Sequence, residues 1–259
     1  ASISLKKNIL TCEYPDGNTT TENLDNFSKL PDKVNSFSKQ FKSKDFKFKF
    51  LSNGLFGFIG HEAIEYFENI SLDQKKESND IPELHYAVYQ NVIAISLFNH
   101  ETYLFSHVYN QNHNLDKIQL ILSKENTSSF KFKKIDSKKS NLTDKEFVEN
   151  VKKGIKHCHR GDVFQLVLSR RFSQKFKGDE FNVYRKLRSI NPSPYLFFFD
   201  YGDFKIFGSS PEAQLIIDSG FAEIHPIAGT FKRTGDDKID SAAAIKLSED
   251  EKEKGERVV

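Results

Sequence analysis

The strongest constraint on the fold is a run of short strand-like segments with no helical pattern inside it. We expect strands at Tyr195–Asp200, Lys205–Gly208, Ala213–Asp218 and Glu223–Ile227. Helical patterns lie outside this run, at Phe181–Ile190 before it and over residues 239–259 after it. Helices that are segregated from consecutive strands are typical of the α+β class. We therefore predict an α+β fold with antiparallel β-sheets.

The first half of the chain is also mostly β in pattern. Val92–Phe98 predicts a buried strand and Thr102–Tyr109 a second one, with Asn99–Glu101 as the hairpin turn between them. Tyr14–Gly17 has Pro and Gly at positions typical of a turn, because Pro presets φ and Gly accepts positive φ. A helix is expected within the connection formed by residues 22–45.

A segment rich in Lys and Ser, Lys133–Asn141, is expected to be a linker. We accordingly divide the chain into an N-terminal region, residues 1–139, and a second region, residues 140–259.

A helix with clear boundary signals follows this segment. Thr143 and Glu146 have the spacing of a capping box. Its buried face is predicted from apolar residues at helical spacing, namely Phe147, Val151 and Ile155. Gly161 is expected just after the last turn of the helix. Beyond it, Val163–Phe172 is predicted to be a strand.

Composition narrows the class of protein. The 259 residues include 38 basic and 36 acidic side chains, and the net charge of +2 gives no overall field for nucleic acid or membrane. No apolar run is long enough to cross a bilayer, and the N-terminus lacks a basic-then-apolar signal pattern. Cys12 and Cys158 suggest no disulfide framework. We expect a cytoplasmic protein that binds neither nucleic acid nor membrane.

Alternating Lys and Phe at residues 46–50 and 130–133 could form a basic, aromatic surface for nucleic acid. Strict alternation is better explained by half-buried strands with lysine facing solvent.

Several short motifs could carry chemistry, and each also has an ordinary structural explanation. Gln165 lies on a mostly apolar strand face, so it is either a functional group or a hydrogen-bonding core residue. Asn191–Tyr195 is a stiff turn before a strand. Gly208–Glu212 places small residues and an acid at a corner between strands, and Pro226–Thr230 ends a strand.

Three further motifs are weaker. Gly54–Gly60 lacks the glycine spacing of a phosphate loop. It instead predicts a strand to which another part of the backbone comes close. The side chains of His157, Cys158 and His159 would point in different directions from a helix, so they cannot converge on one metal ion. Glu253 and Glu256 lie on one helix face, for which a solvated surface is the ordinary explanation.

Taken together, these motifs resemble the chorismate-utilising enzyme family, and within it most closely the large subunits (component I) of anthranilate synthases. The matching segments follow the family's order: Gly161–Phe172, Asn191–Phe198, Gly208–Glu212 and Pro226–Thr230, with Gly54–Phe58 and Glu65–Glu68 similar to its N-terminal region. The resemblance covers essentially the whole chain. It implies antiparallel sheets with helices packed outside and a deep cleft between subdomains, with residues 140–259 as the first part of the catalytic domain.

The resemblance also implies an activity. The resemblance to anthranilate synthases implies a lyase reaction of tryptophan biosynthesis, in which chorismate and ammonia give anthranilate and pyruvate. It uses Mg²⁺ as cofactor, a glutamine amidotransferase subunit as the source of ammonia, and tryptophan as feedback inhibitor. By resemblance, the catalytic residues are Glu212 (the general acid), Gln165 and Glu253, the metal ligand is Glu256, the substrate contacts are Gly229 and Thr230, and the tryptophan contacts are Pro194, Tyr195 and Leu196.

Two positions discriminate among relatives of this family. Relatives that add water resemble this chain but carry a Lys base at the position of Gln165, and an amide cannot deprotonate water. Many aminodeoxychorismate synthases carry a Lys where Ala228 stands, and its amine can attack the ring covalently. Gln165 therefore favours ammonia as the nucleophile, and Ala228 favours anthranilate synthase. Aminodeoxychorismate synthase and a non-catalytic binding module of the same fold remain the alternatives.

Parts of the family's pattern are not found in these residues. Arg257 follows Glu256 where the family usually has His. The family's N-terminal half of the tryptophan site, and the catalytic and substrate-binding residues that it carries downstream, have no match here. We therefore expect a polypeptide of these 259 residues alone to be inactive.

Overall fold

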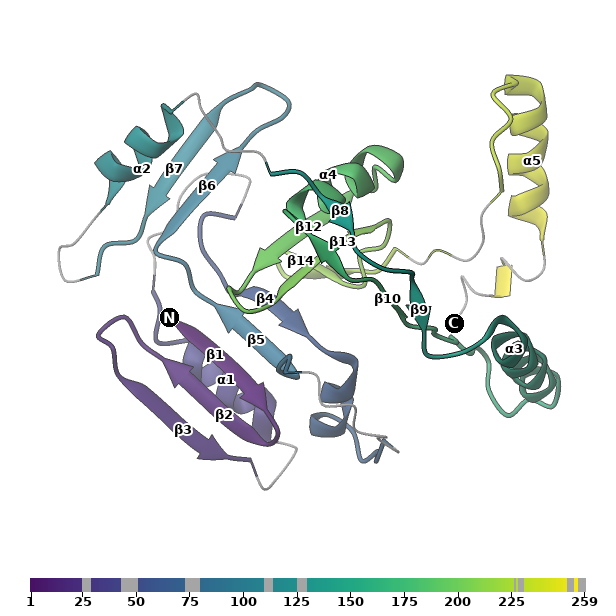
Figure 1. The fold of residues 1–259 in the computed structure, drawn as a ribbon, viewed down its shortest axis with the longest axis horizontal. Helices are drawn as coiled ribbons and strands as arrows, with labels where there is room; N and C mark the ends of the chain where they lie inside the picture. The colour runs from purple at the N-terminus through teal and green to yellow at the C-terminus, as the bar shows by residue number, and fades with distance from the viewer. Residues whose placement is uncertain are drawn as a thin grey trace. The chain divides into compact units, whose positions relative to one another are not determined.

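The computed structural model of the chain describes residues 1–24, 29–42, 51–72, 80–109, 114–124, 130–225, 227, 231–250 and 254–255. The chain divides into two units, Ala1–Thr127 and Ser128–Val259. All the strands labelled in Figure 1 or named below pair in antiparallel fashion, and helices lie between groups of strands along the chain. The predicted α+β class with antiparallel sheets is confirmed. The division into functional regions at residues 139 and 140 stays a prediction.

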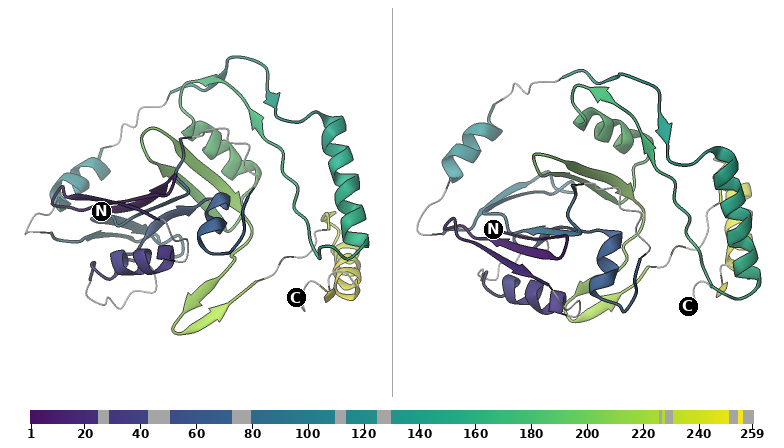
Figure 2. Two further views of the ribbon diagram at one scale, coloured as in Figure 1. Left: turned by 90° about the horizontal axis from the view of Figure 1, so that it is seen from below. Right: turned by 60° about the horizontal axis from the view of Figure 1, so that its bottom comes forward.

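The first unit is built on a five-stranded sheet. In the order β3-β2-β1-β5-β4, its strands are Thr19–Asn23, Ile9–Glu13, Ser2–Lys6, Leu84–Ala87 and Phe56–Ile59. Helix α1 (Leu30–Ser38) lies against one face of this sheet (Figure 2). Ile3 and Leu5 of β1 and Phe37 of α1 are fully or almost fully buried between the two layers. The helix expected within residues 22–45 is confirmed.

Local sequence sets the turn between β2 and β3. The Gly17 amide donates to the Tyr14 carbonyl oxygen over 3.0 Å, and Gly17 has a φ of +84°. This is the left-handed region that glycine enters without steric cost, so the turn predicted at Tyr14–Gly17 is confirmed.

The glycine-rich segment before residue 60 forms β4. A Cβ at Gly57 would lie 1.9 Å from the carbonyl oxygen of His85 on the neighbouring strand β5. The close backbone approach predicted there is confirmed. The short 3₁₀ helix η2 (His61–Tyr66) follows and adds Ala63 and Tyr66 to the core.

Strands β6 (Asn91–Ile95) and β7 (Thr102–Ser106) form the predicted hairpin, and helix α2 (Leu115–Leu122) follows. The hairpin is confirmed, but the burial expected for Val92–Phe98 is wrong. Phe98 is 97% exposed, because it lies in the turn beyond the end of β6 and none of the described residues covers it.

The second unit opens with a two-stranded ribbon where a linker was expected. Strands β8 (Lys133–Lys134) and β9 (Lys139–Ser140) pair with β11 (Phe176–Lys177) and β10 (Phe172–Ser173). The Asp136 side chain, between the two pairs, accepts hydrogen bonds from Gln174 Nε2 at 3.0 Å and the Lys175 amide at 3.2 Å. The linker prediction for Lys133–Asn141 is therefore wrong. Lys133, Lys134 and Lys139 are exposed residues of paired strands.

Helix α3 (Asp144–His159) begins and ends where the sequence predicts. Thr143 and Glu146 form both hydrogen bonds of the capping box. At the other end, the Gly161 and Asp162 amides donate to the carbonyl oxygens of Cys158 and His157, at 3.0 and 3.1 Å. This is the Schellman arrangement.

The predicted buried face of α3 is largely open. Gly154 is the buried residue of the helix, because Leu166 and Leu168 pack over it, with Leu166 Cδ2 2.8 Å from the position of a Cβ. Ile155 is 51% exposed and Val151 36% exposed. The expected burial of these two residues is wrong, since none of the described residues covers that part of the helix.

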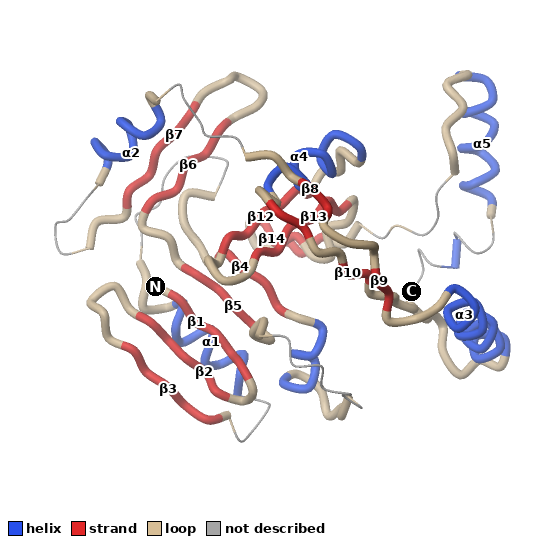
Figure 3. The backbone as a smooth tube through the Cα atoms, viewed as in Figure 1, coloured by secondary structure: helices blue, strands red, loops and turns tan. Residues whose placement is uncertain are grey.

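The strand predicted at Val163–Phe172 is also wrong, except at its end. Only Phe172, as the first residue of β10, is paired as a strand, and residues 163–171 are drawn as a loop in Figure 3. Among the described residues no strand lies beside residues 163–170, so the hydrogen bonds of a ladder are missing.

The rest of the second unit follows the predicted order. Helix α4 (Phe181–Ile190) and strand β12 (Tyr195–Asp200) have the predicted bounds, and β13 (Lys205–Ser210) is two residues longer. Strands β14 (Ile216–Asp218) and β15 (Phe221–Glu223) form a hairpin, but both are shorter than predicted, and β15 begins earlier in the chain. Helix α5 (Asp237–Glu249) ends well before residue 259, because Asp250 has an extended backbone.

Candidate active site

The hairpin of β12 and β13 brings two of the singled-out motifs together. Tyr195 pairs with Ser210 and Leu196 with Ser209, so the start of β12 lies beside the end of β13. Pro194, Tyr195 and Leu196 are thereby placed next to the segment that leads to Glu212. The other sequence-predicted residues are not joined to this group by any contact of the described residues.

Aromatic residues hold the hairpin in place. On one face, Phe198 and Phe207 stack on each other with ring centroids 5.5 Å apart. Phe181 and Tyr184 of α4 pack against Phe198, at 4.9 and 5.4 Å between centroids. On the other face, the Phe197 ring covers Gly208, its cross-strand partner. The helix thus packs on one side of the middle of the hairpin.

A charged group ties α4 to the same hairpin. Lys205 Nζ lies 2.7 Å from a carboxylate oxygen of Glu180 and 3.6 Å from one of Asp200. The hydrogen bond from Lys205 holds the pKa of Glu180 below its ordinary value, and the same bond raises the pKa of Lys205. Both groups therefore stay charged at neutral pH.

Glu212 follows β13 at an exposed corner. Its backbone amide donates to Ser210 Oγ over 3.2 Å, and Ser210 Oγ lies 3.3 Å from the Glu212 carbonyl oxygen. These two contacts fix the backbone of Glu212 and leave its carboxylate accessible. A carboxyl group in this position can exchange a proton with a bound molecule.

The stiff turn Asn191–Tyr195 is tied to β13 by a side chain that sequence reasoning did not single out. Ser209 Oγ donates to the Asn191 carbonyl oxygen over 2.6 Å. The same oxygen accepts the Ser193 amide at 3.0 Å. The only sequence signal for this role was a pair of adjacent serines at the end of a predicted strand.

Gln165 lies in the extended segment after α3. Its side chain is exposed and forms no hydrogen bond within the part of the chain that the structure describes. Its neighbours Leu166 and Leu168 turn toward Gly154 of α3. Within the described residues, the structure therefore does not support the interpretation of Gln165 as a hydrogen-bonding core residue.

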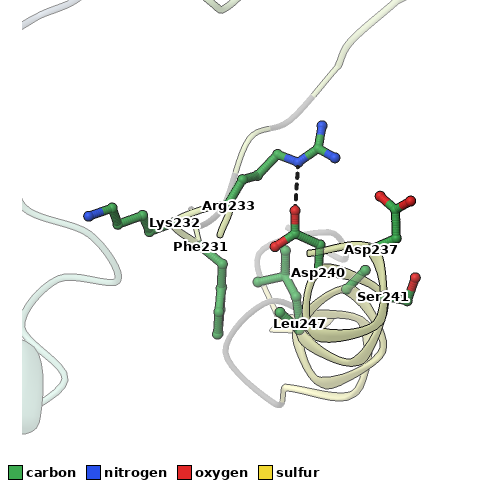
Figure 4. Close-up of a pocket in the computed structure, with 9 residues that line it drawn as sticks. Phe231, Lys232, Arg233, Asp237, Asp240, Ser241 and Leu247 are labelled. Atoms are coloured by element: carbon green, nitrogen blue, oxygen red, sulfur yellow. Dashed lines mark hydrogen bonds and ion pairs between the residues drawn. The ribbon is translucent and has the colours of Figure 1, made fainter. Parts of the chain in front are cut away.

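A shallow groove of about 360 Å³ lies beside α5, between Phe231 and Arg233 on one side and Leu247 on the other (Figure 4). Asp240 on its wall accepts hydrogen bonds from the Thr234 amide at 2.8 Å, Thr234 Oγ1 at 2.9 Å and Arg233 Nε at 3.2 Å. These hydrogen bonds lower the pKa of Asp240 from 3.8 to about 2, and the bond from the Thr234 amide has the largest effect. Asp240 thus anchors the chain that enters α5, a role the sequence reading missed.

Four of the predicted site residues, Gly229, Thr230, Glu253 and Glu256, lie outside the described residues. Lys254 and Gly255, between the two glutamates, have helical backbone. Over the ranges that the structure describes, no three His, Cys, Asp or Glu side chains are grouped to hold a metal ion. No described helix combines the length and the apolar character that a membrane crossing requires.

Comparison with known proteins gives one consistent result. Residues 4–259 match the family described as chorismate binding enzyme. Anthranilate synthase component 1 of Aquifex aeolicus is 44% identical over 121 residues, which are 47% of this chain and 24% of that protein. The protein of the same name from Saccharomyces cerevisiae is 34% identical over 229 residues, which are 81% of this chain and 45% of that protein.

The fold agrees with a solved structure. The crystal structure of anthranilate synthase component I from Streptococcus pneumoniae TIGR4 matches with a TM-score of 0.72 and 25% sequence identity. The match covers 99% of this chain and 57% of the crystallised chain. The chain thus spans about half the length, or less, of the relatives that it matches.

Proposed function

This chain belongs to the family of chorismate binding enzymes, and on that premise we propose that it acts as the large subunit of an anthranilate synthase. The proposed reaction converts chorismate and ammonia to anthranilate, pyruvate and water. The observation that carries the proposal is the β12–β13 hairpin, which lays Tyr195 opposite Ser210 and so aligns two of the family's motifs side by side.

In this proposal the Glu212 carboxyl group donates the proton that the departing hydroxyl group of chorismate requires. A general acid must reach the leaving oxygen while its backbone stays fixed. The contacts between Ser210 and the Glu212 backbone, together with the exposed position of the residue, support this role.

Gln165 and Ala228 support anthranilate formation over the related reactions. An amide cannot remove a proton from water, whereas ammonia attacks a ring carbon without prior deprotonation. Alanine at residue 228 offers no amine for covalent attack on the ring. Together these residues favour anthranilate as the product over a hydroxylated or aminodeoxy compound.

The cofactor we propose is Mg²⁺, held by Glu256 with Glu253 beside it. Carboxylate oxygens are the ligands that Mg²⁺ prefers, and two residues three apart on a helix face the same way. The helical backbone of Lys254 and Gly255 supports that spacing. When bound, Mg²⁺ would neutralise the ring carboxylate of chorismate, while Gly229 and Thr230 contact the substrate.

The remaining assignments concern regulation and partners. Pro194, Tyr195 and Leu196 would form part of a tryptophan pocket, in which the half-exposed Tyr195 ring offers an aromatic surface. A glutamine amidotransferase subunit would supply ammonia, in the cytoplasm. Residues 1–139 would form the N-terminal region and residues 140–259 the first part of the catalytic domain.

The test is a fluorescence assay for anthranilate with chorismate, ammonium and Mg²⁺, run on the native enzyme that contains these residues. A coupled assay with aminodeoxychorismate lyase runs beside it, because that product is not visible without the lyase. Anthranilate formation supports the proposal. A signal only with the lyase supports aminodeoxychorismate synthase, and consumption of no chorismate supports a binding module.

A further inference from the structure

The segment that carries Gln165 runs back beside helix α3 (Figure 2). It leaves the C-terminal end of the helix at Asp162, whose carboxylate lies 2.7 Å from Nδ1 of His157. Further along, Arg170 Nη1 donates to the carboxylate of Asp144, the first residue of α3, over 2.6 Å. The chain between Asp162 and Arg170 thus returns from one end of the helix to the other.

Gly154 is the residue at which this segment touches the middle of the helix. It is the buried residue of α3. A Cβ at Gly154 would lie 2.8 Å from Leu166 Cδ2 and 3.7 Å from Leu168 Cδ1. The missing side chain therefore leaves a notch in the helix surface, which the two leucines occupy.

The contact at the notch decides which side chains of the segment face the helix. Leu166 and Leu168 lie on α3, whereas Val167 between them is 85% exposed. Gln165, the other neighbour of Leu166, is also exposed. Neighbouring side chains of a chain that alternates in this way point to opposite sides. The seating of Leu166 therefore directs Gln165 away from the helix.

Arg170 fixes the position of the segment along the helix. Besides its bond to Asp144, its Nε donates to Ser140 Oγ over 2.7 Å, and its guanidinium lies 4.7 Å from the centroid of the Phe172 ring. The Arg170 side chain is 18% exposed. A side chain held by three partners resists sliding of the segment along α3, so Gln165 has a defined place between Arg170 and the end of the helix.

We propose that Gly154 is a positioning residue for Gln165: by seating Leu166 on α3, it holds the Gln165 amide beside the ring carbon that ammonia attacks. This inference rests on the proposed function, in which Gln165 stands where water-adding relatives carry the base that activates the nucleophile. A larger side chain at residue 154 would fill the notch and push Leu166 outward, and Gln165 would move with it. Misplacing a reacting group by about 1 Å can slow a reaction about 100-fold.

The first experiment varies the size of residue 154 in the native enzyme and measures kcat/KM for ammonia. Gly154→Val should lower this constant by about 10- to 100-fold. Gly154→Ala should stay closer to the wild type, because its Cβ meets only the flexible end of Leu166. Lys153→Val puts the same residue at the exposed neighbouring position and should stay within about twofold of the wild type. Valine is no worse than glycine inside a helix, so helix propensity does not explain a loss.

The same substitution in a Gln165→Ala background separates positioning from a general effect on the fold. If Gly154 acts through Gln165, Gly154→Val should cost less than about twofold once the amide is gone. An equal loss in both backgrounds would overturn the inference, and so would an unchanged kcat/KM in Gln165→Ala alone. A wild-type enzyme that forms no anthranilate would instead overturn the proposed function.

A second measurement tests the seating without an activity assay. In enzyme with labelled leucine methyl groups, NMR should show a nuclear Overhauser effect between a Leu166 methyl group and the Gly154 α-protons. In Gly154→Val the methyl resonances of Leu166 and Leu168 should shift, while those of Leu187 on α4 stay in place. Absence of the Overhauser effect in the wild type, or an equal shift at Leu187, would overturn the inference.

Discussion

The ring of Phe197 lies over Gly208, its cross-strand partner, so closely that a Cβ at residue 208 would come within 2.6 Å of Phe197 Cζ. Residue 208 must be glycine because the Phe197 ring leaves no room for a Cβ atom there. The ring in turn covers the backbone of Gly208. The pair therefore stabilises the hairpin that carries Glu212.

The first prediction concerns this pair. Gly208→Ala should displace the Phe197 ring and lower the free energy of unfolding by about 1 kcal/mol, as expected for modest overpacking. Urea unfolding measures the change. A leucine at residue 197 is smaller at its far end, so Gly208→Ala should cost less in a Phe197→Leu background. Equal costs in the two backgrounds would show that the ring does not set the requirement for glycine.

The second prediction concerns Glu212. In the native enzyme, Glu212→Gln should slow turnover by about 100-fold or more with a modest change in KM, because the amide cannot donate a proton to the leaving hydroxyl group. Steady-state kinetics of anthranilate formation measure both constants. Glu62→Gln, at an exposed glutamate of η2, is the control and should behave as wild type. Near-wild-type kcat in Glu212→Gln would remove Glu212 from the mechanism.

The third prediction concerns the proposed metal ligand. Glu256→Ala should sharply raise the Mg²⁺ concentration needed for activity while the far-UV circular dichroism spectrum stays unchanged. Glu62→Ala serves as the matched loss of one exposed carboxylate. An unaltered Mg²⁺ titration of Glu256→Ala would return Glu256 to an ordinary solvated helix face.

The fourth prediction concerns acid stability at the start of α5. The pKa of Asp240 is about 2 when folded, below its ordinary value of 3.8, so its ionised form stabilises the folded state. That contribution is fully present above pH 4 and is lost as the pH falls toward 2. Thermal melts between pH 6 and pH 2 should show it.

Asp240→Asn should be less stable than wild type near neutral pH and should lose less stability on acidification. Asp237→Asn, one turn away on the same helix, is the control and should keep the wild-type pH dependence. The same pH dependence in Asp240→Asn and wild type would contradict the role of the Arg233 and Thr234 hydrogen bonds.

Local signals were sufficient for some elements of the fold. The capping box at Thr143 and Glu146 and the glycine after α3 fixed both ends of that helix, because the groups that cap a helix lie within a few residues of it. Asn191 and Pro192 ended α4 in the same way. The turn at Tyr14–Gly17 likewise depends only on its own residues.

Elements that depend on distant partners were predicted less well. Residues 163–171 alternate in the manner of a strand, yet alternation cannot say whether a neighbouring strand is present. Lys133–Asn141 has the composition of a linker and still pairs with two strands that lie 32 to 44 residues later, because backbone hydrogen bonds do not require apolar side chains.

The candidate site shows the same limit. The order of motifs indicated Glu212 and the residues from Pro194 to Leu196, and the hairpin register then placed Tyr195 opposite Ser210, at the end of the strand that precedes Glu212. The hydroxyl of Ser209 could not be assigned from sequence, because its acceptor is a backbone carbonyl 18 residues away. Any serine at the end of a strand has the same local appearance.

The double capping of α3 has a consequence for the order in which the chain folds. Its start and stop signals are local, so we expect this helix to form on the microsecond scale, before any long-range pairing. The ribbon on either side of it must close a loop of about 40 residues between Lys134 and Phe176, which is entropically costly for an open chain. When α3 is already formed, only the residues on either side of it remain flexible. The entropic cost of pairing the two arms of the ribbon is then smaller, so the helix lowers the free-energy barrier to this pairing.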